Sequence, residues 1–331
     1  MSGGAGAAGG AGAGDATGAT VAESVEFCGL RLAHRVINGS GTFDAIAART
    51  AFGRALEIDF PFAAYVSKTI TLRPRNGNPP PRLWEAAGGL INSIGLPNKG
   101  LHDYLAEDVP RLVGLSTRVP AEAGERLPVP LITNVMGSSA EEFTALVSAC
   151  EQRAEIAALE LNVSCPNVET GLDIGADPDQ LRAVVSACRA STAKPLIVKL
   201  TPNTADVPAC ALAAQEGGAD AVSLINTLRA MALAPGAGVD VRRPRSAGGA
   251  APRWLGGGTG GLSGPAIRAV ALAQVAAVAG RVSIPVVGMG GVQRAAHARD
   301  LLDAGAALVA VGTETFRDPA TAARIAGELR S

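Results

Sequence analysis

Short apolar runs alternate with helical segments along most of the chain. Eight of these runs are rich in β-branched and apolar residues and have the length of buried strands. Some show little alternation of polar and apolar residues, as expected of strands that are covered on both faces. The eight candidate strands are 35–40, 63–69, 130–137, 156–164, 195–201, 219–227, 284–291 and 306–313.

Helical segments separate the later strands, so the pattern is a repeated βα unit, which predicts a parallel sheet. Eight repeats, without a GxGxxG motif after the first strand, favour an α/β fold of the (β/α)8 TIM-barrel type over an open doubly wound sheet. The predicted helices are 140–154, 178–191, 205–215, 264–279 and 293–304.

The chain shows no boundary that would separate two cores. Its glycine- and alanine-rich start predicts a disordered tail over 1–22, and 23–331 are expected to form one barrel domain. The longest irregular stretch, 234–260, is predicted to be a loop between the sixth strand and its helix. Loops of this length are usually functional or mobile.

The charge balance excludes several classes of partner. The 29 basic and 30 acidic side chains give a net charge of -1, which provides no basic face for nucleic acid or for an anionic membrane. No apolar run reaches the roughly 18 residues that a membrane-spanning helix needs. The first twenty residues also lack the basic and apolar regions of a signal peptide.

The cysteines favour a reducing compartment. There are 5 of them, an odd number, without a CxxC pair, which argues against a disulfide framework, structural zinc or an iron–sulfur cluster within this chain. Cys150, Cys188 and Cys210 lie in helical stretches, where a small buried apolar side chain is the expected role. We therefore expect a cytoplasmic protein.

Polar residues end most of the predicted strands. In a (β/α)8 barrel these ends form the active site, and here they carry Lys68, Lys199 and the asparagines Asn134, Asn162 and Asn226. A single asparagine at such a position is open to a purely structural role. Buried lysines are costly without an anionic partner, so both lysines indicate a negative group in the pocket.

Glycines follow the last two strands, in GMGGV and VGTETF. They place backbone N–H groups where this fold commonly holds a phosphate. A phosphorylated cofactor therefore fits the site, and FMN also uses lysine and asparagine around a planar ring. Lys199 is the candidate cation for stabilising an anionic reduced flavin.

Cys165 follows the fourth strand in ELNVSCPNVETG. A cysteine on a loop at the catalytic rim is placed to exchange a proton or to attack a substrate. The histidines His34, His102 and His297 lie away from the strand ends, and no spacing of His and acidic residues predicts a metal site. A serine or cysteine hydrolase is disfavoured because no GxSxG motif occurs and no histidine lies at the rim to activate Cys165.

These residues belong to motifs that together resemble the dihydroorotate dehydrogenase family, and within it class 1, which has a cysteine base. The motifs run from about residue 25 to the end and are SKTITLRPRNGNPPPR, NSIGLPNKG, ELNVSCPNV, VKLTPN, LINTL, TGGLSGPAI, IPVVGMGGV and VAVGTETFRDP. The resemblance implies oxidation of (S)-dihydroorotate to orotate in UMP biosynthesis. Cys165 would take a proton from C5 while hydride leaves C6 for N5 of FMN.

The same resemblance assigns binding roles residue by residue. It implies substrate binding by Lys68, Asn92, Ser93, Ile94, Gly95, Leu96, Asn162, Asn226 and Thr227. It implies FMN binding by Ser40, Lys68, Thr69, Asn134, Asn162, Lys199, Ile225, Gly264, Gly290, Gly291, Gly312 and Thr313.

The electron acceptor is less clearly marked. GNPPPR, INTL, GMGGV and VGTETFRDP resemble the NAD-linked class 1B type, which works with an FAD/[2Fe–2S] subunit as a heterotetramer, whereas NSIGLPN is nearer the homodimeric, fumarate-using class 1A type. Asp44 and the enlarged 234–260 stretch depart from the family pattern. Alternatives are a related flavin barrel that acts on another pyrimidine and a catalytically silent barrel scaffold.

Overall fold

The computed structural model describes residues 24–118, 126–163, 174–234 and 253–330, and its core is a barrel of eight parallel strands. Their order is β3-β16-β15-β12-β11-β10-β9-β4, and the N–H of Ala63, just before β4, donates to the oxygen of Val36 in β3 at 2.9 Å. The eight predicted strands and the (β/α)8 fold are thereby confirmed. The strands are β3 (Val36–Asn38), β4 (Tyr65–Val66), β9 (Leu131–Val135), β10 (Ile156–Asn162), β11 (Leu196–Lys199), β12 (Ala221–Leu224), β15 (Val286–Met289) and β16 (Leu308–Val311).

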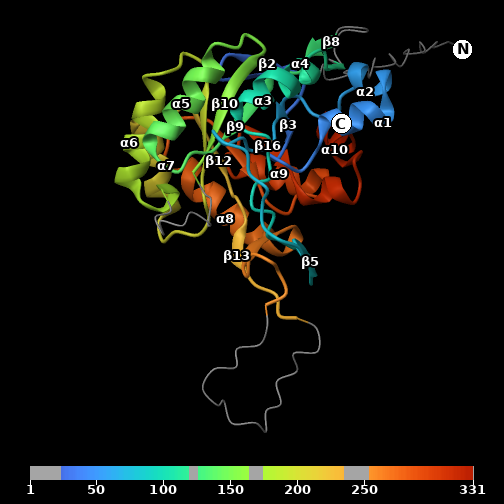
Figure 1. Cartoon of the computed structure of the whole chain (residues 1–331). Coiled ribbons are helices and arrows are strands. Elements are labelled where there is room, and N and C mark those ends of the chain that lie inside the picture. The colour runs from blue at the N-terminus through green and yellow to red at the C-terminus, as the bar shows by residue number, and fades with distance from the viewer. Residues whose placement is uncertain (1–23, 119–125, 164–173, 235–252, 331) are drawn as a thin grey trace, which may run out of the picture.

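Helices surround the barrel (Figure 1). All five predicted helices are present, with ends that differ from the predicted ones by a few residues. Asp44, a departure from the family pattern, caps the first of the helices, because its Oδ1 accepts hydrogen bonds from the N–H groups of Ile46 and Ala47. The outer helices are α1 (Ala45–Phe52), α2 (Arg54–Ile58), α5 (Ala140–Glu151), α6 (Pro178–Arg189), α7 (Val207–Glu216), α8 (Arg268–Ala279), α9 (Ala295–Asp303) and α10 (Thr321–Arg330).

Short elements fill the connections. A helical stretch between the second and third barrel strands consists of α3 (Leu101–Asp103), the π-helical turn η1 (Tyr104–Asp108) and α4 (Val109–Leu112). Single 3-10 turns are η2 (Ile174–Ala176), η3 (Pro265–Ile267) and η4 (Thr313–Phe316). Two hairpins, β1 (Val25–Phe27) with β2 (Leu30–Leu32) and β7 (Ser116–Arg118) with β8 (Arg126–Pro128), complete the described chain.

A four-stranded antiparallel sheet projects from one end of the barrel and is absent from the sequence prediction (Figure 1). Its order is β13-β14-β6-β5, from β5 (Leu83–Ala86), β6 (Gly89–Asn92), β13 (Leu228–Ala230) and β14 (Gly260–Ser263). The expectation of an irregular loop over 234–260 is therefore wrong at its end, where Gly260 begins β14. Residues 235–252 of that stretch lie outside the described residues.

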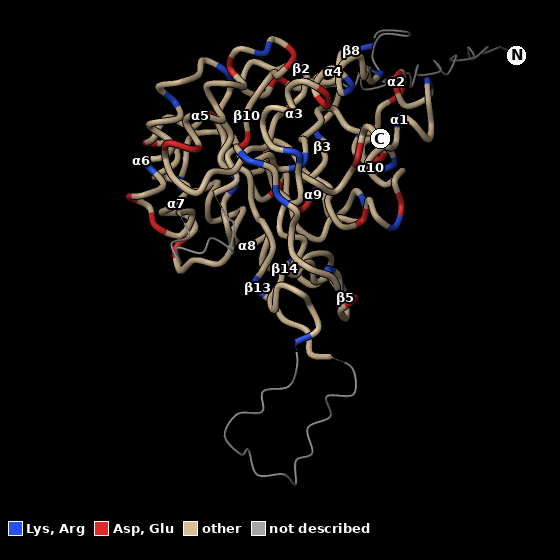
Figure 2. Tube along the Cα trace, in the orientation of Figure 1, with Lys and Arg blue, Asp and Glu red and all other residues tan. Residues whose placement is uncertain are grey.

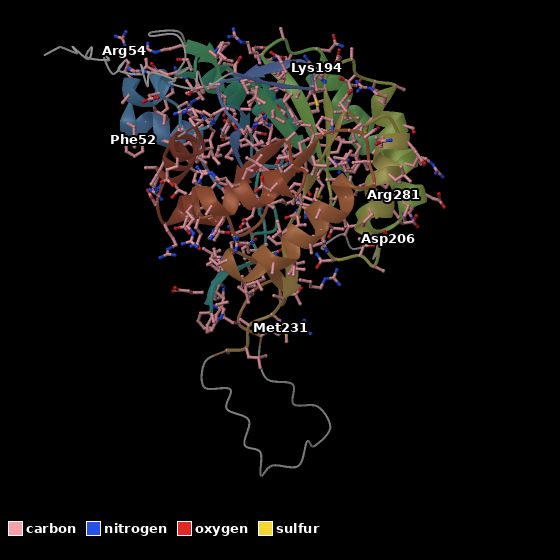
Figure 3. The ribbon with its side chains drawn as sticks, turned by 180° about the vertical axis from the view of Figure 1, so that it is seen from behind. Phe52, Arg54, Lys194, Asp206, Met231 and Arg281 are labelled. Carbon is pink, nitrogen blue, oxygen red and sulfur yellow. The ribbon has the colours of Figure 1, made fainter. Side chains whose placement is uncertain are left out.

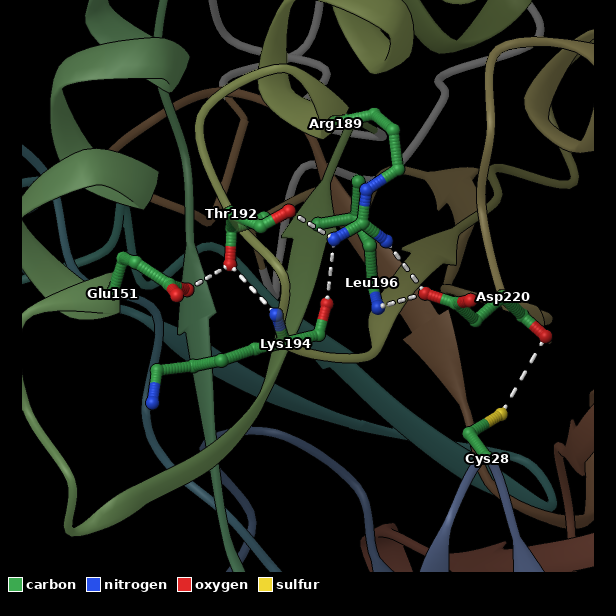
Figure 4. Close-up of polar contacts among 7 residues, drawn as sticks. All are labelled: Cys28, Glu151, Arg189, Thr192, Lys194, Leu196 and Asp220. Carbon is green, nitrogen blue, oxygen red and sulfur yellow. Dashed lines mark hydrogen bonds and ion pairs between the residues drawn. The ribbon is translucent and has the colours of Figure 1, made fainter.

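A polar cluster ties the loops together at the opposite end of the barrel (Figure 4). Arg189 and the N–H of Leu196 both donate to Oδ2 of Asp220, at 2.7 and 2.8 Å. The thiol of Cys28 donates to the backbone oxygen of Asp220 at 3.5 Å, and burial together with the Asp220 charge raises its pKa to about 11. Lys194 belongs to this cluster, and Met231 follows β13 of the projecting sheet. Figure 3 shows these two residues at opposite ends of the molecule.

Burial explains the helix cysteines. Cys150, Cys188 and Cys210 are buried in α5, α6 and α7, as predicted. Burial raises the pKa of both Cys150 and Cys188 to about 12. These thiols are therefore protonated near neutral pH and pack as small apolar groups.

Charged residues of both signs lie around the barrel. Lys and Arg positions are interspersed with Asp and Glu positions along its outer segments (Figure 2), in keeping with the near-zero net charge. Among the described residues, no helix combines the length and the apolar composition that crossing a bilayer requires. The disordered tail predicted over 1–22 lies outside the described residues, so it stays a prediction.

Candidate active site

A cavity of about 690 Å³ lies where the barrel strands end and the projecting sheet begins. Ligand pockets of this size accommodate a cofactor or a drug-sized molecule. The barrel strands contribute one wall through the residues that follow their carboxyl ends, and β6, β13 and β14 contribute residues to the other. The position agrees with the rule that (β/α)8 enzymes build their sites at this end.

The cavity brings together nearly all the residues that the sequence pointed to. Those that line it are Ser40, Lys68, Thr69, Asn92, Ser93, Ile94, Gly95, Leu96, Asn162, Lys199, Ile225, Asn226, Thr227, Gly264, Gly290, Gly291, Gly312 and Thr313. Asn134 is fully buried and does not line the cavity. Cys165 lies outside the described residues, three positions beyond the end of β10.

Lys199 places a buried cation in the cavity wall. The residue is only 6% exposed, and it forms no hydrogen bond or ion pair with any residue that the structure describes. A buried ammonium without a counter-ion is costly, so this wall favours a ligand that carries a negative charge or gains one during the reaction.

Lys68 behaves differently from the prediction. It was expected to be buried, but it is exposed, because it follows β4 and reaches into the open cavity, where its ammonium keeps water. Partial desolvation nevertheless lowers its pKa from the ordinary value, with the Arg82 charge acting in the same direction and Asp44 opposing both. Lys68 is thus a cation available to a ligand that enters the cavity.

The glycines after β15 form a cradle that other residues would fill. Gly290 and Gly291 have φ angles of +131° and +71°, which L side chains rarely adopt. A Cβ on Gly290 would lie 2.6 Å from Cβ of Ala271, and one on Gly291 would lie 2.7 Å from Cβ of Arg268. The absence of side chains therefore leaves backbone facing the cavity, as a phosphate site requires.

Replacing Gly291 by alanine is expected to weaken cofactor retention and to destabilise the protein by about 1–3 kcal/mol, because the new Cβ is strained and collides with Arg268. Gly327→Ala is the matched control, since nothing lies within 4 Å of a Cβ there and the residue is helical. Thermal unfolding and the flavin content of both purified variants check this. Equal flavin content in Gly291→Ala and in the parent would count against the cradle.

Hydrogen bonds order the polar side chains of the cavity. Asn162 donates through Nδ2 to Oγ1 of Thr69 at 3.2 Å, and the hydroxyl of Ser40 donates to the oxygen of Ser67 at 2.8 Å. On the sheet side, Nδ2 of Asn92 donates to the oxygen of Gly261 at 3.2 Å. These hydrogen bonds hold the side chains of Asn92 and Asn162 in place in the cavity wall, where their amides can both donate and accept.

The sequence analysis missed the residues that the projecting sheet adds. No strand-like alternation marks these short, glycine-rich segments, which is why Arg229 in β13 was missed, whereas Phe316 lies in the turn η4 after β16 and no signal in the sequence marks it. A further omission is Glu160, a buried carboxylate whose only signal was a single acidic residue in the apolar strand IAALELN. The missed lining residues include Leu83, Leu90, Arg229, Thr259, Gly261, Ser263, Gln293, Glu314 and Phe316.

Known proteins of one family match this chain along most of its length. The family model described as "Dihydroorotate dehydrogenase" matches residues 23–331. Proteins named "Dihydroorotate dehydrogenase B (NAD(+)), catalytic subunit" are similar, one from Trichlorobacter lovleyi at 42% identity over 92% of this chain and 91% of its own length. A protein of the same name from Geobacter sulfurreducens is 40% identical over 92% of this chain and 91% of its own length.

A solved structure supports the fold. The crystal structure of DHODH from Eimeria tenella, in complex with ferulenol, superposes with a TM-score of 0.67 over 95% of this chain and 85% of its own, at 22% identity. At that identity the likeness concerns the fold alone, whereas the family match and the relatives near 40% identity concern the sequence itself. On these grounds the chain belongs to the dihydroorotate dehydrogenase family.

Proposed function

We propose that the chain is the FMN-dependent catalytic subunit of a dihydroorotate dehydrogenase, which oxidises (S)-dihydroorotate to orotate in UMP biosynthesis. The observation that carries the proposal is one cavity that combines a buried Lys199, an open Lys68 and a glycine cradle. A catalytically silent scaffold would have no use for an uncompensated buried cation beside such a cradle.

The residues present fit FMN. Gly290, Gly291 and Gly312 offer backbone to a phosphate, and Lys199 offers a cation to the ring. Oδ1 of Asn134 is a buried acceptor without a partner among the described residues, so it suits a ligand N–H. When bound, FMN supplies the acceptor for the hydride that leaves the substrate.

Lys68 and the asparagines would hold the substrate. The ammonium of Lys68 suits the carboxylate of dihydroorotate, and the amides of Asn92, Asn162 and Asn226 can both donate to and accept from the edge of a pyrimidine. Such contacts orient the reacting carbons and exclude water from them.

Cys165 is proposed as the base that takes the proton from C5. Its role rests on its sequence position after β10, since its structure is not described. Cys28, Cys150 and Cys188 are poor candidates, because their pKa values are raised and none of them lines the cavity. A thiol near its ordinary pKa of about 8.5 can act near neutral pH if the site lowers that value modestly.

We further propose that electrons pass to NAD through an FAD/[2Fe–2S] partner subunit in a cytoplasmic heterotetramer. The relatives at about 40% identity are named as catalytic subunits of an NAD(+)-linked enzyme, which supports this choice. A homodimer that uses fumarate is the alternative, favoured by the NSIGLPN motif.

The test is to purify the chain, record its flavin spectrum and add dihydroorotate without oxygen. Bleaching of a yellow protein is expected, followed by slow reoxidation with NAD alone and fast reoxidation with NAD once the partner subunit is added. Rapid turnover of the isolated chain with fumarate would establish the homodimeric type. A colourless protein that takes up no FMN would favour the scaffold, and a yellow one that dihydroorotate leaves oxidised would favour another pyrimidine substrate.

A further inference from the structure

Glu160 is a buried carboxylate inside the barrel, close to the proposed cofactor site. It lies in β10 and is 3% exposed. Both of its oxygens are used, because Nδ2 of Asn134 donates to Oε2 at 2.5 Å and the hydroxyl of Ser223 donates to Oε1 at 2.7 Å. Glu160 therefore joins three strands, β9, β10 and β12, by side chains alone.

This contact determines which way the Asn134 amide faces. Because Nδ2 donates to Oε2 of Glu160, the NH₂ group of the amide faces Glu160 and Oδ1 faces away from it. Oδ1 is buried and has no hydrogen-bond partner among the residues that the structure describes. Buried acceptors are rarely left without a donor, so this oxygen, which lies behind the cavity lining and not in it, needs a donor that the described residues do not supply.

The cluster of Glu160, Asn134 and Ser223 lies beside the polar wall of the cavity. Glu160 is two residues before Asn162, so the two side chains share a face of β10, and Asn162 lines the cavity. Ser223 pairs in register with Lys199, which lines the cavity too. The backbone oxygen of Asn134 accepts from the N–H of Ile70, the residue after the lining Thr69.

We propose that Glu160 is a positioning residue, which fixes the Asn134 amide so that Oδ1 accepts a hydrogen bond from an N–H of the bound cofactor ring. The role rests on the proposed FMN site and adds to it a residue that does not touch the ligand. A glutamine at 160 could itself donate to Asn134. The Asn134 amide would then turn over and present NH₂ where the ring requires an acceptor.

The chain provides a matched control at the far end of the barrel. Glu151 also accepts a hydrogen bond from a hydroxyl, that of Thr192, in the cluster of Figure 4. Glu151→Gln makes the same chemical change without access to the cavity. Comparing the two variants separates a general effect of replacing a hydrogen-bonded glutamate by glutamine from a specific effect on cofactor binding.

The experiment measures the Kd of FMN for the apoprotein by flavin fluorescence quenching, the reduction potential of the bound flavin and the Tm. Glu160→Gln is expected to raise the Kd about 10- to 100-fold, as loss of a charge-assisted contact does, and to shift the potential. In an Asn134→Ala background the same change should alter the Kd less than about 3-fold, because Glu160 acts through Asn134. Glu151→Gln should leave both cofactor measurements at the parent values.

A Kd of FMN and a flavin potential equal to those of the parent in Glu160→Gln would overturn the proposal. It would also be overturned if the free-energy effects of Glu160→Gln and Asn134→Ala on FMN binding were additive in the double variant. If Glu160→Gln does not fold, Ser223→Ala tests the proposal instead, because it removes one of the two hydrogen bonds that hold the Glu160 carboxylate. Ser223→Ala should raise the Kd of FMN a few-fold in the parent protein and leave it unchanged in the Asn134→Ala background. If the parent protein binds no FMN, both the proposed cofactor and the proposed role of Glu160 are refuted. FMN binding by the parent with no change in any variant would refute the role of Glu160 alone.

Discussion

Replacing Cys165 by alanine is expected to leave FMN bound and to slow flavin reduction by dihydroorotate about 10²- to 10⁴-fold, the contribution of a positioned base. The substrate would still bind through Lys68 and the asparagines, but the C5 proton would have no acceptor. Anaerobic stopped-flow mixing that follows the bleaching of the flavin measures the rate directly. Cys165→Ser should also be slow, because a hydroxyl is a poorer base near neutral pH.

Cys28→Ala is the control for this experiment. Cys28 lies at the other end of the barrel, and its raised pKa of about 11 keeps the thiol protonated. The control should therefore reduce its flavin at the parent rate. Cys165 would be an ordinary loop residue if its alanine variant did the same.

Lys199→Ala is expected to raise the Kd of FMN about 10- to 100-fold, or to make the bound flavin harder to reduce, because it removes a buried positive charge from the cavity wall. The barrel should still fold, since the Lys199 side chain forms no hydrogen bond or ion pair with a described residue and the substitution leaves the backbone pairing of β11 in place. Fluorescence titration of the apoprotein gives the Kd, and redox titration gives the potential.

Lys194→Ala provides the comparison. Lys194 donates to the oxygen of Arg153 at 3.1 Å at the far end of the barrel, so its removal costs a hydrogen bond and leaves the cavity intact. Its FMN affinity and potential should match those of the parent. Full flavin occupancy and an unchanged potential in Lys199→Ala would contradict the assignment of this lysine.

The barrel could be predicted because its strands are short, mainly apolar and largely buried on both faces, and because helical segments alternate with them. The projecting sheet could not. Its strands hold 3 or 4 residues each and include glycines in β6 and β14, and the pairing of β6 with β14 joins residues 169 positions apart. No local pattern records such a pairing, because long-range backbone contacts rather than side-chain burial define it.

Some residues of the candidate site could likewise be predicted from the sequence, and others could not. Residues at strand ends, such as Lys199 and Asn162, could be predicted from the rule that active sites lie at the carboxyl ends of barrel strands. Glu160 could not, because a single acidic residue within a strand does not show whether it faces water, a helix or the barrel interior. Lys68 was misjudged since the sequence does not reveal how open a cavity is.

The pairing of β6 with β14 also has a consequence for how the protein folds. Asn92 and Gly261, which this pairing joins, are 169 residues apart, and the segment between them contains four of the eight barrel strands, β9 to β12. Closing so long a loop before the barrel exists would cost much chain entropy, so this wall of the cavity forms late. A ligand that needs both walls cannot assist the early steps, and it stabilises the protein by slowing unfolding rather than by speeding folding.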